Sequence, residues 1–309
     1  MSKNISRRSF IKKGLTVSAA SVLSASLIPK LGFAGRNLSG EEIADSAVVS
    51  GSNGFDATLK AVELTGGMEK YVSKGAKVGI LVNSKFRNIG TYVDPDVTLA
   101  AIKMIKDAGA SRIFCIQDIL PVYWERTELS GEYQSLIDSL EYKSDIMVKK
   151  LENTTKLREA DVFEQLFDCD VFINVAIPKH HRSAAYTGLM KNMMGINTRS
   201  TNLYFHLGGE YKNDPEFLSQ CIADLNTIRK PDLCIADMQQ VITNNGPAGP
   251  GDLLKPGKVI AGKEIIPVDH KCAVILGHQK DELQVFAMGE KHGLGNRDYS
   301  TLNIKETSI

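Results

Sequence analysis

Four short apolar runs, separated by segments with helical periodicity, constrain the fold of this chain more than any other feature. The runs cover residues 77–82 (KVGILV), 112–117 (RIFCIQ), 171–177 (VFINVAI) and 233–236 (LCIA). Continuous apolar runs of this length are typical of strands buried on both faces, and parallel strands are usually joined by helices. The sequence therefore predicts an α/β fold with a mostly parallel sheet flanked by helices, either as one core or as two lobes that share it.

Several helix and turn signals lie between and after these runs. Asp94 and Pro95 predict the start of one helix, because Asp accepts hydrogen bonds from free backbone amides and Pro suits the first turn. A second helix is expected over residues 184–194. Residues 259–268 are expected to form a short hairpin, after which Asp269 opens another helix.

Polar side chains follow each of the four predicted strands. In strand order they are Asn83, Asp118, the group Lys179, His180 and His181, and Asp237. The carboxyl ends of parallel strands meet at one edge of a sheet, which is where ligands of such folds bind. Any one of these residues can simply be a turn residue, since Asn and Asp favour turns, but the set indicates a site.

The segment at 178–182 (PKHHR) concentrates four cation-capable side chains directly after the third strand. This composition suits an anionic ligand, and neutral imidazoles can also bind a metal, whose identity the sequence leaves open. Neighbouring residues of an extended chain point to opposite sides, so only one of His180 and His181 is expected to face a ligand unless the segment turns. A solvated cationic loop is the alternative interpretation.

Lys191 and Asn192 interrupt an otherwise apolar run at 188–195 (GLMKNMMG). A lysine in this position either extends to solvent or serves a buried polar site, and a buried asparagine needs hydrogen-bond partners. The predicted catalytic residues are Asp118, His180, Lys191 and Asp237. The predicted ligand-binding residues are Asn83, Lys179, His181, Asn192, His206, Asn245, Gly246 and Asp269.

The motifs of several common protein classes do not occur in the chain. Its five cysteines are scattered without a C-x-x-C pair, so no intrinsic four-cysteine iron–sulfur cluster is predicted, and the cofactor is left open. A Walker A loop, a G-x-S-x-G elbow, H-E-x-x-H and a strand-linked G-x-G-x-x-G are also missing from the sequence. Because long basic runs are missing too, no nucleic-acid partner is expected.

The N-terminus carries an export signature. Residues 6–12 (SRRSFIK) nearly match the twin-arginine pattern S-R-R-x-F-L-K, an apolar run covers 14–28, and 32–34 (GFA) suits cleavage. The apolar run is short and rich in Ser, Ala and Thr, so no stable membrane span is expected. The alternative is a basic tail followed by an ordinary helix.

This signature predicts the domain organisation and the location of the protein. We expect a signal peptide at 1–34, a polar linker at 35–56 and a single α/β domain at 57–309. The twin-arginine translocase would carry the folded chain to the periplasm or beyond the cell. Removing residues 1–34 takes away six cations and no acid, which changes the formal charge from +1 to −5.

Passages spread over residues 57–304 together resemble the domain of unknown function 362 family. They are 66–68 (GGM), 94–96 (DPD), 170–181, 188–195, 230–233 (KPDL), 245–247 (NGP), 259–269 and 293–295 (GLG). The resemblance implies an α/β fold and a polar site formed by the Lys-x-His segment, Lys191 with Asn192, and the Asn-Gly-Pro loop, without implying a reaction. Members of this family often have Lys-Pro-Asn where this chain has residues 81–83 (LVN), and some carry ferredoxin-like cysteine clusters that it lacks.

Two hypotheses about function follow. The first is an enzyme or redox-associated protein whose lysines and histidines engage a small anionic substrate or cofactor, with Asp118, Asp237 or Asp269 as the acid–base group or metal ligand. The second is a periplasmic binding or accessory protein that holds an anion or a partner without turning it over. A deep cleft in which Asp, His and Lys converge favours the first, and an open groove without a general base favours the second.

Overall fold

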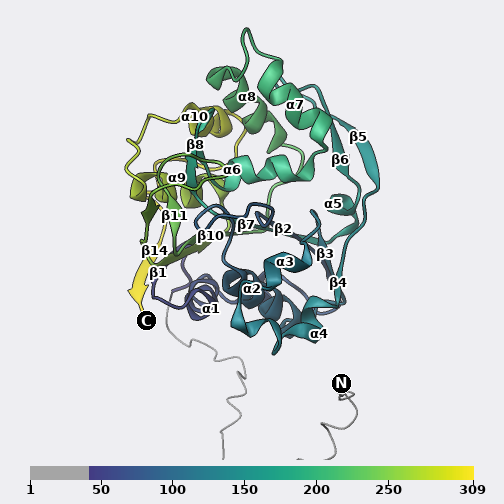
Figure 1. Ribbon diagram of the computed structural model, residues 1–309, viewed down its shortest axis with the longest axis vertical. Helices are drawn as coiled ribbons and strands as arrows, with labels where there is room; N and C mark the ends of the chain where they lie inside the picture. The colour runs from purple at the N-terminus through teal and green to yellow at the C-terminus, as the bar shows by residue number, and fades with distance from the viewer. Residues whose placement is uncertain (1–41) are drawn as a thin grey trace, which may run out of the picture. The chain divides into compact units, whose positions relative to one another are not determined.

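An eight-stranded sheet runs through the centre of residues 42–309, which are the residues that the computed structural model describes (Figure 1). Its strands, in spatial order, are β14 (Ile304–Ser308), β1 (Ser46–Ser50), β13 (Lys258–Gly262), β10 (Leu233–Met238), β7 (Val171–Ala176), β2 (Lys77–Val82), β3 (Arg112–Cys115) and β4 (Leu140–Glu141). All neighbours pair in parallel except that β13 is antiparallel to both β1 and β10. The predicted mostly parallel α/β fold is confirmed.

Helices cover both faces of this sheet (Figure 1). One face carries α1 (Gly54–Leu64), α2 (Pro95–Asp107), α3 (Pro121–Trp124) and α4 (Gln134–Ile137). The other carries α5 (Gln165–Asp168), α6 (Leu189–Asn192), α7 (Arg199–Leu207), α8 (Pro215–Leu225), α9 (Ile265–Ile275) and α10 (Gln284–Lys291). No helix within residues 42–309 has both the length and the apolar character needed to cross a membrane.

Each face of the sheet has its own hydrophobic core, because alternate strand residues point to opposite sides. In β2, Ile80 and Val82 belong to the core beneath α1 and α2, and Leu81 belongs to the core beneath α6 and α8. All six residues of β7 are buried, which explains why its sequence is an almost continuous apolar run.

The remaining described elements are short. Three two-stranded ladders pair β5 (Ile146–Lys150) with β6 (Glu159–Phe163), β8 (Lys179–His181) with β9 (Ala185–Thr187), and β11 (Val241–Ile242) with β12 (Leu253–Leu254). The 3-10 helices are η1 (Met68–Lys70), η2 (Glu128–Ser130) and η3 (Met193–Ile196).

The start of α2 follows the predicted capping pattern. Asp94 is the N-cap residue, and its side chain accepts a 2.9 Å hydrogen bond from the Asp96 amide. Pro95 occupies the first turn, where its missing amide hydrogen costs nothing. Local sequence therefore determines where this helix begins.

Two local predictions are wrong. The helix expected over 184–194 is instead strand β9 followed by the short α6, and Gly188 separates the two. A Cβ atom on Gly188 would lie 1.8 Å from Asp269 Oδ1, so the chain passes this point without a side chain. The hairpin expected over 259–268 is strand β13 followed by helix α9, because both edges of β13 are already paired with β1 and β10.

The predicted division of the chain needs one correction. Ser46–Ser50, expected to lie in a polar linker at 35–56, form β1 between β13 and β14. The folded part of the chain therefore begins before residue 57, and residues 42–309 form one compact unit. The predicted signal peptide at 1–34 lies outside the described residues.

Candidate functional site

The carboxyl ends of β2, β3, β7 and β10 lie at the same edge of the sheet, because these strands run parallel. The predicted site residues that follow them therefore share one edge. Asn83 continues from β2 through its main chain, which donates to Val175 O and accepts from Val93 N. Side-chain contacts divide the other residues into separate groups, so the predicted convergence is only partial.

Lys179 is a fully buried lysine without an acidic partner. Its side chain is 0% exposed, its Nζ donates to the Thr91 carbonyl, and it lies 4.0 Å from the centroid of the Phe86 ring. No carboxylate among the described residues forms an ion pair with it. Burial, and after it the charge of Lys191, lower the pKa of Lys179 to about 7. Its amine is therefore available in both protonation states near neutral pH.

His180 and His181 point to opposite sides of the extended strand β8. His180 Nδ1 accepts a 3.0 Å hydrogen bond from the Gly246 amide, and His181 Nδ1 accepts from the amides of Ser183 and Ala184 at 3.1 and 3.2 Å. An accepting Nδ1 carries no hydrogen, so each neutral ring holds its hydrogen on Nε2 and can donate it.

Helices α6 and α7 bring two further cation-capable groups to His181. The His206 ring stacks on the His181 ring with 6.5 Å between centroids and 13° between planes. Burial, and after it the charge of Lys191, lower the pKa of His181 to about 2. Lys191 Nζ lies 3.0 Å from Met194 Sδ, and burial lowers the pKa of Lys191 to about 8.

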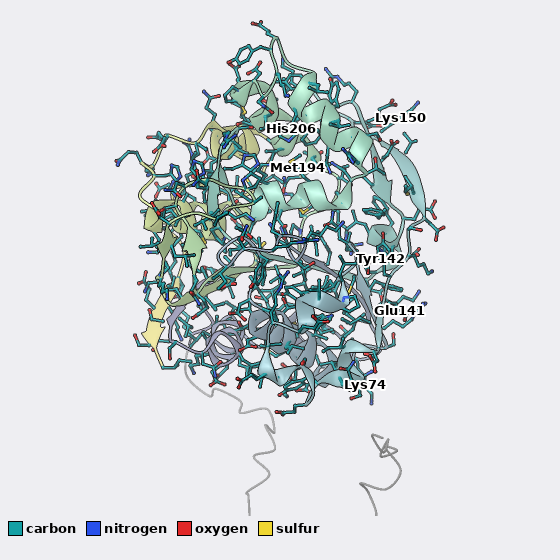
Figure 2. The ribbon with its side chains drawn as sticks, viewed as in Figure 1. Lys74, Glu141, Tyr142, Lys150, Met194 and His206 are labelled. Carbon is teal, nitrogen blue, oxygen red and sulfur yellow. The ribbon has the colours of Figure 1, made fainter. Side chains whose placement is uncertain are left out.

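These four side chains, Lys179, His181, Lys191 and His206, form what we call the cationic cluster. The charge of Lys191 lowers the pKa values of the other three members, and none of the four is ion-paired with a carboxylate in residues 42–309. Figure 2 places His206 and Met194 on the α6 to α8 side of the sheet. An anion would relieve this mutual repulsion, so the cluster is suited to bind one.

Asn192 ties α6 to the central strand β7. Its Nδ2 donates to Asn174 Oδ1 at 2.7 Å and to Val175 O at 3.2 Å, and Asn174 Nδ2 donates to Leu189 O. These bonds satisfy a buried asparagine and hold the helix that carries Lys191. Sequence reasoning missed Asn174, although a polar residue inside the run 171–177 was a visible signal.

The loop at 244–251 packs directly against His180. A Cβ atom on Gly246 would lie 1.7 Å from His180 O, so only glycine fits there. Asn245 adopts a φ of 53°, which Asn tolerates better than most residues, and its side chain donates to Pro250 O. Asn88 Nδ2 donates to Ala248 O at 2.8 Å and joins this loop to the loop that follows β2.

Asp237 belongs to β10, and its carboxylate contacts the start of α2. Its Oδ2 accepts from the Asp94 amide at 2.6 Å and its Oδ1 from the Gln239 amide at 2.9 Å. Burial, and after it the charge of Asp94, raise the pKa of Asp237 to about 7. No cation in the described chain pairs with it, so its contacts are those of a residue that holds α2 to β10.

Asp269, a predicted ligand-binding residue, makes its hydrogen bonds to the segment around α6. It lies within α9, and its carboxylate accepts from the Tyr186 hydroxyl at 2.6 Å and from the amides of Leu189 and Met190 at 2.8 Å each. The carboxylate therefore anchors the start of α6. Sequence reasoning could not see this, because it depends on which main-chain amides reach the side chain.

Asp118 lines a different feature, a pocket of about 360 Å³ at the end of β3. A second pocket, near His270 and Arg297, lies outside the predicted site. No hydrogen bond or ion pair joins Asp118, Lys191 and Asp237, three of the predicted catalytic residues, within residues 42–309. Within residues 42–309, no three His, Cys, Asp or Glu side chains are grouped so that they could hold a metal ion.

Most of the chain matches one family of proteins. Residues 77–274 match the family described as Domain of unknown function (DUF362), and the chain belongs to this family. The matched range includes the whole cationic cluster and the Asn-Gly-Pro loop. Among curated proteins, none matches the chain.

Two solved structures are similar to this chain at low sequence identity. One is the lactate racemase apoprotein from Thermoanaerobacterium thermosaccharolyticum, with 12% sequence identity, a TM-score of 0.45 and 77% of this chain covered. The other is a protein from Thermotoga maritima, with 8% identity, a TM-score of 0.35 and 78% of this chain covered. This chain covers 57% and 60% of those two chains, respectively.

Proposed function

We propose that the protein binds a small anionic ligand at the cationic cluster and acts on it as a proton-transfer enzyme with Lys179 as the base. The observation that carries this proposal is the gathering of two lysines and two imidazoles with no described carboxylate to pair with them. Uncompensated positive charge in a buried site is costly, and a bound anion would offset that cost.

Three members of the cluster have a definable part in this mechanism. The Lys191 ammonium and the His181 Nε2 hydrogen would hold the anionic group of the ligand. The neutral Lys179 amine would take a proton from a carbon next to a carbonyl: the C–H bond breaks, an N–H bond forms, and the electron pair stays on the ligand as an enolate. The proton then returns from Lys179 to that carbon.

A second candidate, a non-catalytic periplasmic binding or accessory protein, is favoured by one observation. Lys179 is fully covered, with Phe86 over its ammonium, so a ligand reaches it only if the loop at 83–90 moves. Small carboxylates with a carbonyl group, incubated with the protein in deuterium oxide, distinguish the candidates. An enzyme of this kind exchanges the hydrogen next to the carbonyl and loses that exchange on Lys179→Met, whereas a binding protein gives no exchange.

Sulfate binding tests the anion site directly, because sulfate stays dianionic from weakly acidic to alkaline pH. We expect the sulfate dissociation constant, measured by calorimetry at constant ionic strength, to rise by up to about tenfold per pH unit above the Lys191 pKa of about 8. The sign follows from proton loss: as pH rises, the lysines of the cluster become neutral and lose their attraction for the anion. Lys191→Met should weaken binding by about tenfold near pH 7.

Lys74 provides the matched control for this experiment. It is exposed and lies at the opposite end of the molecule from His206 and Met194 (Figure 2). Lys74→Met should bind sulfate as the parent does. If Lys191→Met also binds sulfate like the parent, or if binding is equally strong at pH 7 and pH 9, the anion site is not the cationic cluster.

We further propose that the twin-arginine signal directs export of the folded chain to the periplasm. The support is the order of elements in residues 1–34: arginine pair, apolar run and small residues at the end. Changing Arg7 and Arg8 together to lysine should keep the protein in the cytoplasm of a bacterium that has the translocase, as shown by fractionation and immunoblotting. Lys30→Arg should be exported normally, and an undiminished periplasmic fraction of the double variant would contradict the proposal.

A further inference from the structure

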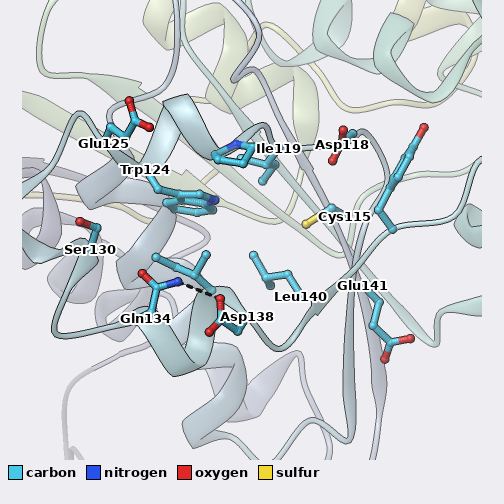
Figure 3. Close-up of a pocket in the computed structure, with 13 residues that line it drawn as sticks. Cys115, Asp118, Ile119, Trp124, Glu125, Ser130, Gln134, Asp138, Leu140 and Glu141 are labelled. Atoms are coloured by element: carbon cyan, nitrogen blue, oxygen red, sulfur yellow. Dashed lines mark hydrogen bonds between the residues drawn. The ribbon is translucent and has the colours of Figure 1, made fainter.

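The pocket at the end of β3 is separate from the cationic cluster. It measures about 360 Å³ and lies between β3, α3, α4 and β4 (Figure 3). Apolar side chains form part of its wall, including Ile119, Pro121, Ile137 and Leu140. None of the four side chains of the cationic cluster lines it, so any ligand that it takes is held by other chemistry.

Trp124 gives this pocket an unpaired hydrogen-bond donor. Its side chain is more than nine-tenths buried, with 7% exposed, and packs edge-on against Tyr123 at 4.9 Å between ring centroids. The indole N–H meets no acceptor among the described residues, and the nitrogen lies at the end of the ring that faces the interior of the pocket (Figure 3). A ligand with an oxygen acceptor would satisfy it.

The charge of the pocket is negative. Its lining includes four carboxylates and no Lys, Arg or His. Glu141 is paired with Arg112, and Asp138 accepts a hydrogen bond from α4. Asp118 and Glu125 accept no hydrogen bond and form no ion pair within residues 42–309, which leaves two carboxylates for a ligand.

The Cys115 thiol, which also lines the pocket, does not alter this charge. Burial, and after it the charge of Asp118, raise the pKa of Cys115 to about 12, so its thiol stays neutral. The negative charge that acts on Cys115 also acts on anything bound beside it. An anionic ligand would be repelled here, whereas a cation would be attracted.

We propose that this pocket binds a small organic cation that carries an oxygen acceptor, such as an amino alcohol. The ammonium group would lie near Asp118, its oxygen would accept from the Trp124 N–H, and the indole would add a cation–π contact, while Glu125, on the other side of Trp124, would add only to the negative potential (Figure 3). This site takes a ligand of opposite charge to the one proposed for the cationic cluster. The proposal for this pocket does not depend on the proposal for the cationic cluster.

Trp124 is also the reporter for the test, because it is the only tryptophan in the chain. We expect titration of the purified protein with choline, at ionic strength held constant with sodium chloride, to give a saturable change in tryptophan fluorescence. Tetramethylammonium has the same charge but no oxygen, and should bind about tenfold more weakly. No saturable change with either choline or ethanolamine would overturn the proposal, as would equal binding of choline and tetramethylammonium.

Variants of the two free carboxylates test the charge. Asp118→Asn should weaken choline binding by about tenfold and Glu125→Gln by less, while Glu152→Gln, at an exposed acid outside the pocket, should leave it unchanged. Calorimetry on Trp124→Phe should show that the preference for choline over tetramethylammonium is lost. If Trp124→Phe does not fold, Asp118→Asn still tests the proposal: choline binding equal to that of the parent would contradict it.

Discussion

Replacing Lys179 with methionine is expected to raise the free energy of unfolding by about 1–3 kcal/mol at neutral pH. Methionine has a similar volume and removes a buried, unpaired amine that has no acidic partner in the described chain. The gain is reduced by the loss of the hydrogen bond to the Thr91 carbonyl, which costs about 1 kcal/mol. A lysine kept at the expense of stability is what a functional site produces, since selection there favours chemistry over packing.

The stabilisation expected from Lys179→Met depends on pH, and the lowered pKa of Lys179 determines the direction of this dependence. The pKa of Lys179 is about 7 in the folded protein, whereas a lysine freely exposed to water, as in the unfolded chain, has a pKa of 10.5. Between these values only the unfolded chain holds the proton, so the parent becomes less stable as pH falls from 10.5 towards 7, by up to about 1.4 kcal/mol per pH unit. The penalty from Lys179 is therefore complete below pH 7, and the advantage of Lys179→Met shrinks towards pH 10.5.

Urea unfolding followed by circular dichroism, near pH 6.5 and near pH 9, measures both quantities. Lys74→Met is the matched control, because its side chain is exposed and should show no pH-dependent gain. A Lys179→Met protein that is less stable than the parent near pH 6.5 would contradict the buried, unpaired state of the amine. An equal gain at both pH values would contradict the lowered pKa.

The sheet and part of the cationic cluster could be predicted because both are visible in the pattern of apolar and polar residues. Strands β2, β3, β7 and β10 are buried on both faces, so their apolar runs are continuous and their polar ends are visible as interruptions. Strand β1 was missed because five residues that pair with β13 and β14, more than 200 residues away, leave little local signal.

The roles of individual side chains were harder to predict than their positions. Asp237 and Asp269 resemble site carboxylates in sequence, but main-chain amides from distant segments occupy their oxygens. Thr91 and Phe86 enclose Lys179 only because the loop after β2 folds back over β8. Such contacts depend on tertiary packing, which no local pattern encodes.

Asp269→Ala is expected to lower the free energy of unfolding by about 3–5 kcal/mol. The buried carboxylate accepts from the Tyr186 hydroxyl and from the amides of Leu189 and Met190, and alanine would leave the two amides without a partner inside the protein. The Tyr186 hydroxyl would keep only its bond to the main-chain carbonyl of residue 269. Asp269→Asn keeps one acceptor oxygen of similar geometry, so it should lose about half as much. Asp145→Ala removes an exposed carboxylate and serves as the control in the same urea experiment.

Asp269→Ala should also weaken binding at the anion site, although Asp269 is not a member of the cationic cluster. Leu189 and Met190 open α6, and Lys191 is the next residue, so releasing the start of this helix would displace the ammonium that is proposed to hold the anion. We therefore expect Asp269→Ala to weaken sulfate binding by about tenfold, close to the effect of Lys191→Met, and Asp269→Asn to restore most of it. Combining Asp269→Ala with Lys191→Met should add little further loss, because both remove the same contact. Fully additive losses would instead mean that Asp269 acts on the ligand by a route other than α6.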